Sequence, residues 1–260
     1  MQSAMYAPPM LRVSNVHLSF GGVKALGGVD FEVAPGEVLS LIGPNGAGKT
    51  TMLNAISGVF RVTQGSIEFD GQDCTNKKTQ ALAPLGMART FQNIALFTGM
   101  TVQENILLGR HVLMKCGFLS CGVYWGPARA EERRHRERVA SILEFLGIYH
   151  LRNAHVDTLP YGMQKRVELG RAMAVEPKLL LLDEPMAGTT HREKDELVRL
   201  VTEINVSRGI TVILIEHDMG VVMNISHRIV VLDHGVKIAQ GSPAEVSQDG
   251  NVISAYLGQD

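Results

Sequence analysis

The sequence has 260 residues, of which 45% are hydrophobic and 20% are charged, and 25 Lys+Arg against 26 Asp+Glu give a formal net charge of -1. This composition excludes intrinsic disorder as the main state and predicts a globular chain that is long enough to bury a substantial core. The near-neutral balance also disfavours a broad basic surface, so we expect no nucleic-acid partner.

Cysteine usage and hydropathy bear on the compartment. Cys74, Cys116 and Cys121 are odd in number, and no two of them have the two-residue spacing of zinc or redox motifs, which favours reduced thiols in a cytosol. No apolar run approaches the roughly 18 residues that span a bilayer, and residues 1–10 lack the pattern of a secretory signal. We therefore expect the chain itself to be soluble.

The first elements in chain order are predicted strands. Apolar and polar residues alternate from Leu11 to Phe20 and again from Val29 to Val33, as in half-buried antiparallel strands. Three shorter runs are almost entirely apolar: Val38 to Ile42, Leu179 to Leu182, and Thr211 to Ile215. Such runs are typical of parallel strands buried on both faces.

Helical periodicity dominates the middle of the chain. Val139, Ile142, Leu143 and Leu146 recur at i, i+3, i+4 and i+7, and a second helix is predicted to begin near Gln164. We expect a helical lobe inserted from about residue 93 to 157, and we divide the chain into three parts. These are residues 1–92 (antiparallel β subdomain and first part of the core), 93–165 (helical lobe) and 166–260 (remainder of the core).

Two further segments carry local signals. The apolar segment from Val112 to Gly126 is either a contact surface for a membrane subunit or packs on its own lobe, and both interpretations stay open. Near the end, Asp233 to Gly235 separates two apolar runs and predicts a hairpin, and Ser242 to Glu245 has the spacing of a helix capping box.

The segment after the first apolar run has a phosphate-binding motif. Gly43, Pro44, Asn45, Gly46, Ala47, Gly48, Lys49 and Thr50 fit G-x-x-x-x-G-K-[ST] between a predicted strand and a helix opening at Thr50, with Thr51 following. In such a loop, backbone N–H groups surround the phosphates, the lysine reaches the β- and γ-phosphate oxygens, and the threonine hydroxyl can hold Mg²⁺. The motif predicts a P-loop nucleotide site.

Several acidic and polar residues are candidates for the other groups that ATP hydrolysis requires. Asp183 and Glu184 end a buried strand, where Asp183 can face a metal ion and Glu184 can polarise an attacking water. His217, after the next strand, is a candidate contact of the γ-phosphate. Gln92 is a candidate ligand of Mg²⁺ or of the water. We therefore expect ATP and Mg²⁺ as cofactors.

These motifs in this order resemble those of the ATP-binding cassette (ABC) ATPases over essentially the whole chain. Within that family, the sequence is most similar to the subunits of importers for branched-chain and other hydrophobic amino acids. The segment from Leu159 to Arg166 belongs to the resemblance to the whole family. The segments that match the importer subunits are Arg89 to Asn93, Met100 to Asn105, Ile215 to Met219 and Ile253 to Gly258. The resemblance implies a RecA-like P-loop NTPase core in the α/β class, with an N-terminal antiparallel β subdomain and an inserted α-helical lobe.

The resemblance also implies residue roles. Phe20 would stack on adenine, Gln92 would sense nucleotide, Glu184 would be the catalytic base and His217 the switch histidine, while Lys49 would serve both binding and catalysis. Thr50, Gln92 and Asp183 would hold the metal. The segment that would face a partner's nucleotide consists of Leu159, Pro160, Tyr161, Gly162, Met163 and Gln164.

This sequence departs from the family pattern at two places. Against the common L-S-G-G-Q signature, only Gly162 keeps a glycine while Pro160, Tyr161 and Met163 replace other positions, so a serine hydroxyl contact is lost. After Pro185, Thr189 and Thr190 stand where Leu-Asp is usual. These departures put the communication between paired sites in doubt.

The resemblance finally implies partners and a location. A second ABC ATPase subunit, of the same or a different chain, two integral membrane permeases and, indirectly, an extracytoplasmic solute-binding protein would assemble at the cytoplasmic face of the plasma membrane. An ABC exporter ATPase, or a soluble ABC ATPase without a transport role, is the alternative. Repair and translation relatives have two fused cassettes or a long coiled coil, for which 260 residues leave no room.

Overall fold

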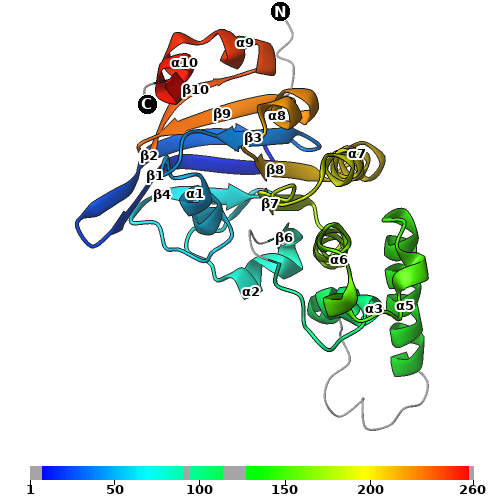
Figure 1. Cartoon of the computed structure of the whole chain (residues 1–260). Helices are drawn as coiled ribbons and strands as arrows, with labels where there is room; N and C mark the ends of the chain where they lie inside the picture. The colour runs from blue at the N-terminus through cyan, green and yellow to red at the C-terminus, as the bar shows by residue number, and fades with distance from the viewer. Residues whose placement is uncertain (1–7, 91–93, 114–126, 258–260) are drawn as a thin grey trace, which may run out of the picture.

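Two β-sheets and the helices around them form the protein (Figure 1). The computed structural model describes residues 8–90, 94–113 and 127–257. Strands β2, β1, β4 and β5 form one sheet in that order, and β10, β9, β3, β8, β7 and β6 form the other. Gln92 and residues 114–126 of the apolar segment lie outside the described residues.

The first sheet is antiparallel throughout. Its strands are β1 (Leu11–Phe20), β2 (Val23–Val33), β4 (Gln64–Phe69) and β5 (Gln72–Asp73). β1 lies between β2 and β4 and pairs with both in antiparallel register. The prediction of antiparallel strands is confirmed, although β2 begins at Val23 and not at Val29, because Gly27 and Gly28 interrupt the visible alternation.

The second sheet brings the predicted parallel strands together. β3 (Val38–Ile42), β7 (Leu179–Asp183) and β8 (Thr211–Ile215) are buried at every residue, and β8 lies between the other two. All three run parallel, which confirms the prediction. Because parallel strands end at the same edge of a sheet, the segments that follow them meet there. The remaining strands are β6 (Met87–Arg89), β9 (Arg228–Asp233) and β10 (Val236–Gly241).

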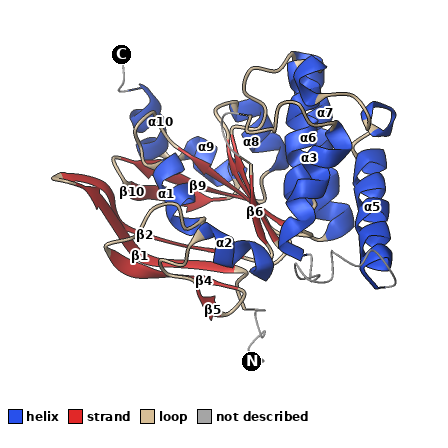
Figure 2. Cartoon of the chain, turned by 90° about the horizontal axis from the view of Figure 1, so that it is seen from below, coloured by secondary structure: helices blue, strands red, loops and turns tan. Residues whose placement is uncertain are grey.

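Alternate residues of β7 face two separate cores, as a period of two requires. Leu179 and Leu181 belong to the core that also holds residues of the antiparallel sheet and of α1 (Lys49–Ile56). Leu180 and Leu182 belong to the core shared with α6 (Tyr161–Met173) and α7 (His191–Arg208). Figure 2 shows α1 on the side of the antiparallel sheet and α6 and α7 on the opposite side.

The helical lobe consists of α3 (Val102–Gly109), α5 (Pro127–Phe145) and the neighbouring α6, which stand away from the antiparallel sheet in Figure 1. The predicted apolar stripe is confirmed, since its members in and just after α5 are all buried: Val139, Ile142, Leu143 and Leu146.

Two helix starts differ from the sequence prediction. α6 begins at Tyr161 and not near Gln164. The sequence hides this start, because Gly162 in the first turn is a poor helix former. α1 begins at Lys49, one residue before Thr50, with Gly48 preceding it at φ 97°.

The C-terminal elements follow their local signals. His234 and Gly235, with φ 44° and 76°, form the turn that joins β9 to β10, which confirms the hairpin. Ser242 and Glu245 form the predicted capping box of α9 (Pro243–Gln248). No helix in the described part of the chain is long and apolar enough to cross a membrane. The other helices are α2 (Thr79–Leu82), α8 (Met219–Ile225), α10 (Gly250–Leu257) and the short 3-10 turns Ala83–Leu85, Arg110–Leu113, Tyr149–Leu151 and Val156–Thr158.

Candidate active site

The loop between β3 and α1 has a backbone that requires glycine at its first position. Gly43 has φ 146°, and a Cβ atom there would lie 2.0 Å from the carbonyl oxygen of Leu232. The side chain of Lys49 turns back over the loop, where its Nζ donates hydrogen bonds to the carbonyl oxygens of Gly43 (2.7 Å) and Pro44 (2.9 Å). The loop therefore forms a tight cradle that holds the ammonium group of Lys49.

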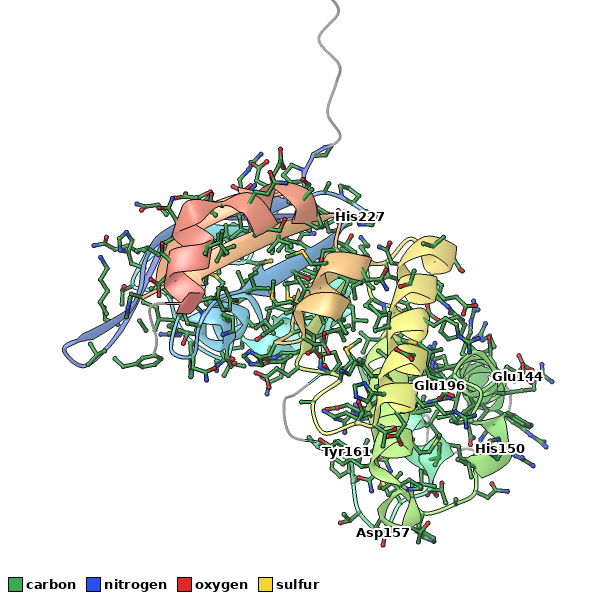
Figure 3. The ribbon with its side chains drawn as sticks, turned by 45° about the horizontal axis from the view of Figure 1, so that its top comes forward. Glu144, His150, Asp157, Tyr161, Glu196 and His227 are labelled. Carbon is green, nitrogen blue, oxygen red and sulfur yellow. The ribbon has the colours of Figure 1, made fainter. Side chains whose placement is uncertain are left out.

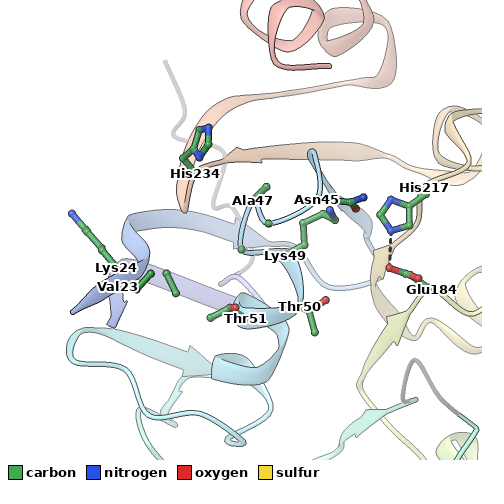
Figure 4. A pocket seen from close by; sticks show the side chains of 13 residues that line it. Val23, Lys24, Asn45, Ala47, Lys49, Thr50, Thr51, Glu184, His217 and His234 are labelled. Carbon is green, nitrogen blue, oxygen red and sulfur yellow. Dashed lines mark hydrogen bonds and ion pairs between the residues drawn. The ribbon is translucent and has the colours of Figure 1, made fainter. Parts of the chain in front are cut away.

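A cleft of ≈ 570 Å³ lies over this loop (Figure 4). Residues 45–51 line it, which places Asn45, Gly46, Ala47, Gly48, Lys49, Thr50 and Thr51 in one site. Glu184 and His217 line it from the ends of β7 and β8. Burial lowers the pKa of the Lys49 ammonium, and the carboxylates of Glu184 and Asp183 act in the opposite direction. The cleft thus joins a phosphate cradle to an acidic and an imidazole side chain.

Glu184 and His217 face each other directly. His217 Nε2 lies 2.6 Å from Glu184 Oε1, and Figure 4 draws this contact beside Lys49. Glu184 has φ 50°, and its N–H donates to the carbonyl oxygen of Ile215 at the end of β8. A carboxylate held by an imidazole at the mouth of a phosphate cradle can accept a proton from water.

Asp183 is buried next to Glu184 and is paired on one side only. Its Oδ2 accepts a hydrogen bond from Arg89 Nη2 at 2.9 Å, whereas its buried Oδ1 has no hydrogen-bond partner among the described residues. Burial raises the pKa of Asp183, and the Arg89 guanidinium opposes this shift. An unpartnered carboxylate oxygen is the kind of ligand that Mg²⁺ takes.

The acidic, histidine and cysteine side chains of the described residues do not form a metal site by themselves. No group of three or more His, Cys, Asp or Glu residues in the described ranges is arranged to hold a metal ion. Mg²⁺ keeps several waters and binds through one or two protein ligands together with substrate phosphates. The residues present therefore fit a metal that arrives with a nucleotide.

Arg89 has a role that the sequence analysis did not assign. Its Nη1 donates to Asn54 Oδ1 (2.6 Å) and Ser57 Oγ (2.8 Å) of the α1 region, while its Nη2 holds Asp183. Arg89 was noted only as the first residue of a family motif. Nothing local in the sequence indicates a partner 94 residues away.

Phe20, predicted to stack on adenine, lies at the end of β1 outside the lining of the cleft. It is 47% exposed and packs edge-on against Phe60, with ring centroids 5.0 Å apart. Its exposure shows that it is not an inward-facing residue of the strand core. The neighbouring part of the cleft is lined by residues 23–25 and His234.

The segment from Leu159 to Gln164 forms the start of α6 and contributes no residue to the cleft of its own chain. Figure 3 labels Tyr161 near Asp157, at the edge of the lobe. Gly162 is buried, and a Cβ atom there would lie 2.2 Å from Glu193 Oε1. The structure therefore separates the predicted partner-facing segment, which includes Pro160 and Met163, from the chain's own phosphate loop.

The fold and the site define a P-loop nucleotide hydrolase, and comparison with known proteins specifies its kind. Residues 26–187 match the ABC transporter family, and residues 236–260 match the family of the branched-chain amino acid ATP-binding cassette transporter. The chain belongs to the ABC transporter family and is an ATP-binding cassette ATPase.

Curated relatives extend over nearly the whole chain. The chain is 41% identical over 252 residues to the high-affinity branched-chain amino acid transport ATP-binding protein BraF of Pseudomonas aeruginosa, covering 96% of this chain and 98% of BraF. It is 40% identical over 252 residues to the high-affinity branched-chain amino acid transport ATP-binding protein LivG of Escherichia coli, covering 96% of this chain and 98% of LivG.

Solved structures agree with the fold. A nucleotide-free ATP-binding cassette from an ABC transporter superposes with a TM-score of 0.84 at 34% identity, covering 97% of this chain and all of the other. A cassette solved as a dimer in a post-hydrolysis state, bound to ADP and Pi, gives a TM-score of 0.76 at 26% identity, covering 90% and 99%.

Proposed function

We propose that this chain is the ATP-hydrolysing subunit of an importer for branched-chain or other hydrophobic amino acids. The observation that carries the proposal is the match of residues 236–260 to the branched-chain amino acid transporter family, a region outside the general ABC match. The near-complete coverage of BraF and LivG, both named as branched-chain amino acid transport proteins, supports it.

In the proposed reaction, the backbone N–H groups of residues 45–48 and the Lys49 ammonium hold the phosphates of ATP. Thr50, Asp183 and Gln92 would hold Mg²⁺, which would neutralise charge on those phosphates. Glu184 accepts a proton from the attacking water, and His217 orients the Glu184 carboxylate. Their 2.6 Å contact on the cleft wall supports these two roles.

The adenine end of the nucleotide is proposed to stack on Phe20. The exposed ring at the end of β1 lies three residues before Val23, which lines the cleft. Phe60 packs against the Phe20 ring in a T-shaped arrangement, and nearly half of Phe20 stays exposed. An exposed aromatic face is suited to a base because every base has a π-face.

We further propose that two cassettes pair so that the segment from Leu159 to Gln164 faces the partner's nucleotide. The absence of this segment from its own cleft and the dimeric relative support the pairing. Two membrane permeases and an extracytoplasmic solute-binding protein complete the proposed transporter, which places this chain at the cytoplasmic face of the membrane. Closure and opening of the cassette pair would move the permeases through the helical lobes.

The test is purification of the chain with its partners from the native membrane. We expect two permeases and a second ATPase to co-purify, and the complex in proteoliposomes to take up labelled leucine only when ATP and Mg²⁺ are present on the cassette side. Lys49→Ala is the control and should abolish uptake. ATP-driven movement of solute in the opposite direction, or purification without membrane subunits, would contradict the proposal.

A further inference from the structure

Glu216 is a buried carboxylate that the proposed reaction does not use. It follows β8 directly, precedes His217, and is 5% exposed. Its Oε1 accepts a hydrogen bond from the Met186 N–H at 2.8 Å, and its Oε2 accepts one from the His217 N–H at 3.3 Å. Burial raises the pKa of Glu216, and these backbone donors oppose the shift. Both oxygens are thus directed at the backbone of the active site.

The Met186 N–H belongs to the turn that carries Glu184. Pro185 has no N–H group, so Met186 supplies the first amide after Glu184. Within this turn the Ala187 N–H donates to the Glu184 carbonyl oxygen at 3.2 Å, and the Met186 side chain is buried in the core. An acceptor for the Met186 N–H therefore fixes where the Glu184 turn sits.

The hydrogen bond from the His217 N–H to Glu216 Oε2 involves the other member of the Glu184–His217 pair. His217 and Glu184 come from the ends of different strands, β8 and β7, which are 33 residues apart in sequence at this point. One carboxylate thus connects the backbone on both sides of their 2.6 Å contact. A shift of either backbone by about 1 Å can cost roughly 10²-fold in rate in a positioned active site.

We propose that Glu216 is a positioning residue for ATP hydrolysis: its carboxylate holds the Glu184 turn and the His217 backbone in mutual register. This inference rests on the proposed role of Glu184 as the base. Two acceptor oxygens are required, because a glutamine amide offers one oxygen and directs its NH₂ group at the remaining N–H. Glutamine should therefore hold one side only, and alanine neither.

The experiment uses the complete transporter complex with Glu216→Ala, Glu216→Gln and Glu184→Gln introduced separately. For Glu216→Ala we expect kcat to fall by roughly 10- to 100-fold while KM for ATP stays within about twofold. Glu216→Gln should give a smaller loss of kcat. After incubation with Mg-ATP and rapid gel filtration, Glu216→Ala complexes should retain ATP, where the parental complex retains ADP.

Asp218→Asn is the matched control, because Asp218 lies two residues further on and contacts neither Met186 nor His217 in the described hydrogen bonds. Its Oδ1 accepts from the Val221 N–H, a bond that asparagine can keep, so kcat should stay near the parental value. This control separates loss of the Glu216 contacts from a general effect of removing a carboxylate in this loop.

The outcomes distinguish two failures. Normal hydrolysis by Glu184→Gln would refute the proposed base, and with it the premise of this inference. If Glu184→Gln blocks hydrolysis but Glu216→Gln and Glu216→Ala keep parental kcat, the positioning role is wrong. The positioning role would also be wrong if the Glu216 variants lost ATP binding in parallel with a lowered unfolding temperature. If Glu216→Ala does not fold, Glu216→Gln, which preserves the shape of the side chain, provides the test.

Discussion

At the residue scale, the contact between Glu184 and His217 leads to the sharpest prediction about hydrolysis. Glu184→Gln should keep ATP binding and lose hydrolysis by about two orders of magnitude or more, because an amide preserves the shape but cannot take a proton from water. Turnover of Mg-ATP and the size of the ATP-bound species by light scattering provide the measurement. Turnover above about a tenth of the parental value would be incompatible with Glu184 as the base.

Phe20 is the second test at this scale. Phe20→Ala should weaken ATP binding by about 1–3 kcal/mol and leave turnover at saturation nearly unchanged, because stacking would act far from the reacting phosphate. Titration with a fluorescent ATP analogue measures the affinity. Phe60→Ala is the companion variant, since it removes the edge contact without removing the exposed ring. Unchanged affinity in Phe20→Ala would reduce the ring to a packing role.

At the element scale, the β9–β10 hairpin braces the phosphate loop. The Gly235 N–H donates to the Ala47 carbonyl oxygen at 3.1 Å, and the Gly235 carbonyl oxygen accepts from the Gly27 N–H at 2.8 Å. Gly235 has φ 76°, and a Cβ atom there would lie 2.4 Å from the Ala25 carbonyl oxygen. The turn therefore connects β2, the loop and β9 through backbone contacts that only glycine permits.

Gly235→Ala should lower the free energy of unfolding by about 2–5 kcal/mol, since a left-handed conformation and a backbone overlap add together, and should weaken ATP binding as well. Gly209→Ala is the matched control: Gly209 also has a positive φ of 64°, but nothing lies within 4 Å of its Cβ position. It should lose only about 1–2 kcal/mol. Urea unfolding measures both, and equal losses would mean that the hairpin contact adds nothing.

The first turn of α6 sets a limit on experiments at this scale. Any side chain at Gly162 meets the carboxylate of Glu193, which caps α7 together with Thr190. A substitution there would disturb this chain before it reached a partner. Tyr161, 44% exposed beside Gly162, offers a cleaner probe of the partner-facing segment.

At the scale of the whole molecule, the separation between the cleft and the start of α6 predicts how activity depends on assembly. The purified chain alone should be mostly monomeric and a poor ATPase, because in the proposed pairing each nucleotide needs the α6 start of a second cassette. Sedimentation and turnover with and without Mg-ATP provide the check. Stable dimers with full activity in the absence of a partner would contradict it.

Within the assembled complex, two substitutions should act on opposite sites. Lys49→Ala should empty this chain's own loop, whereas Tyr161→Asp should leave that loop loaded and place a carboxylate near the partner's γ-phosphate, a repulsion that a low dielectric strengthens. A photo-crosslinkable ATP analogue labels each subunit separately. If Tyr161→Asp reduced labelling of this chain alone, the head-to-tail pairing would be wrong.

The sequence by itself determined the features that depend on neighbouring residues. The phosphate loop, the doubly buried strands such as Leu179–Asp183, the Asp233 to Gly235 turn and the Ser242 capping box were all predictable, because spacing and backbone preference act within a few residues. The order of these motifs also indicated the family. Their individual catalytic roles remain predictions.

Only the tertiary structure decided which distant residues meet. The order of the strands places β8 beside β7, which brings His217 to Glu184 and Glu216 to Met186. It places β6 on the other side of β7, which brings Arg89 to Asp183. These partners lie 30 to 94 residues apart, and no local pattern encodes such a pairing. The physical reason is that periodicity indicates which faces are buried, whereas the packing of strands and helices against one another selects the contacts made at their ends.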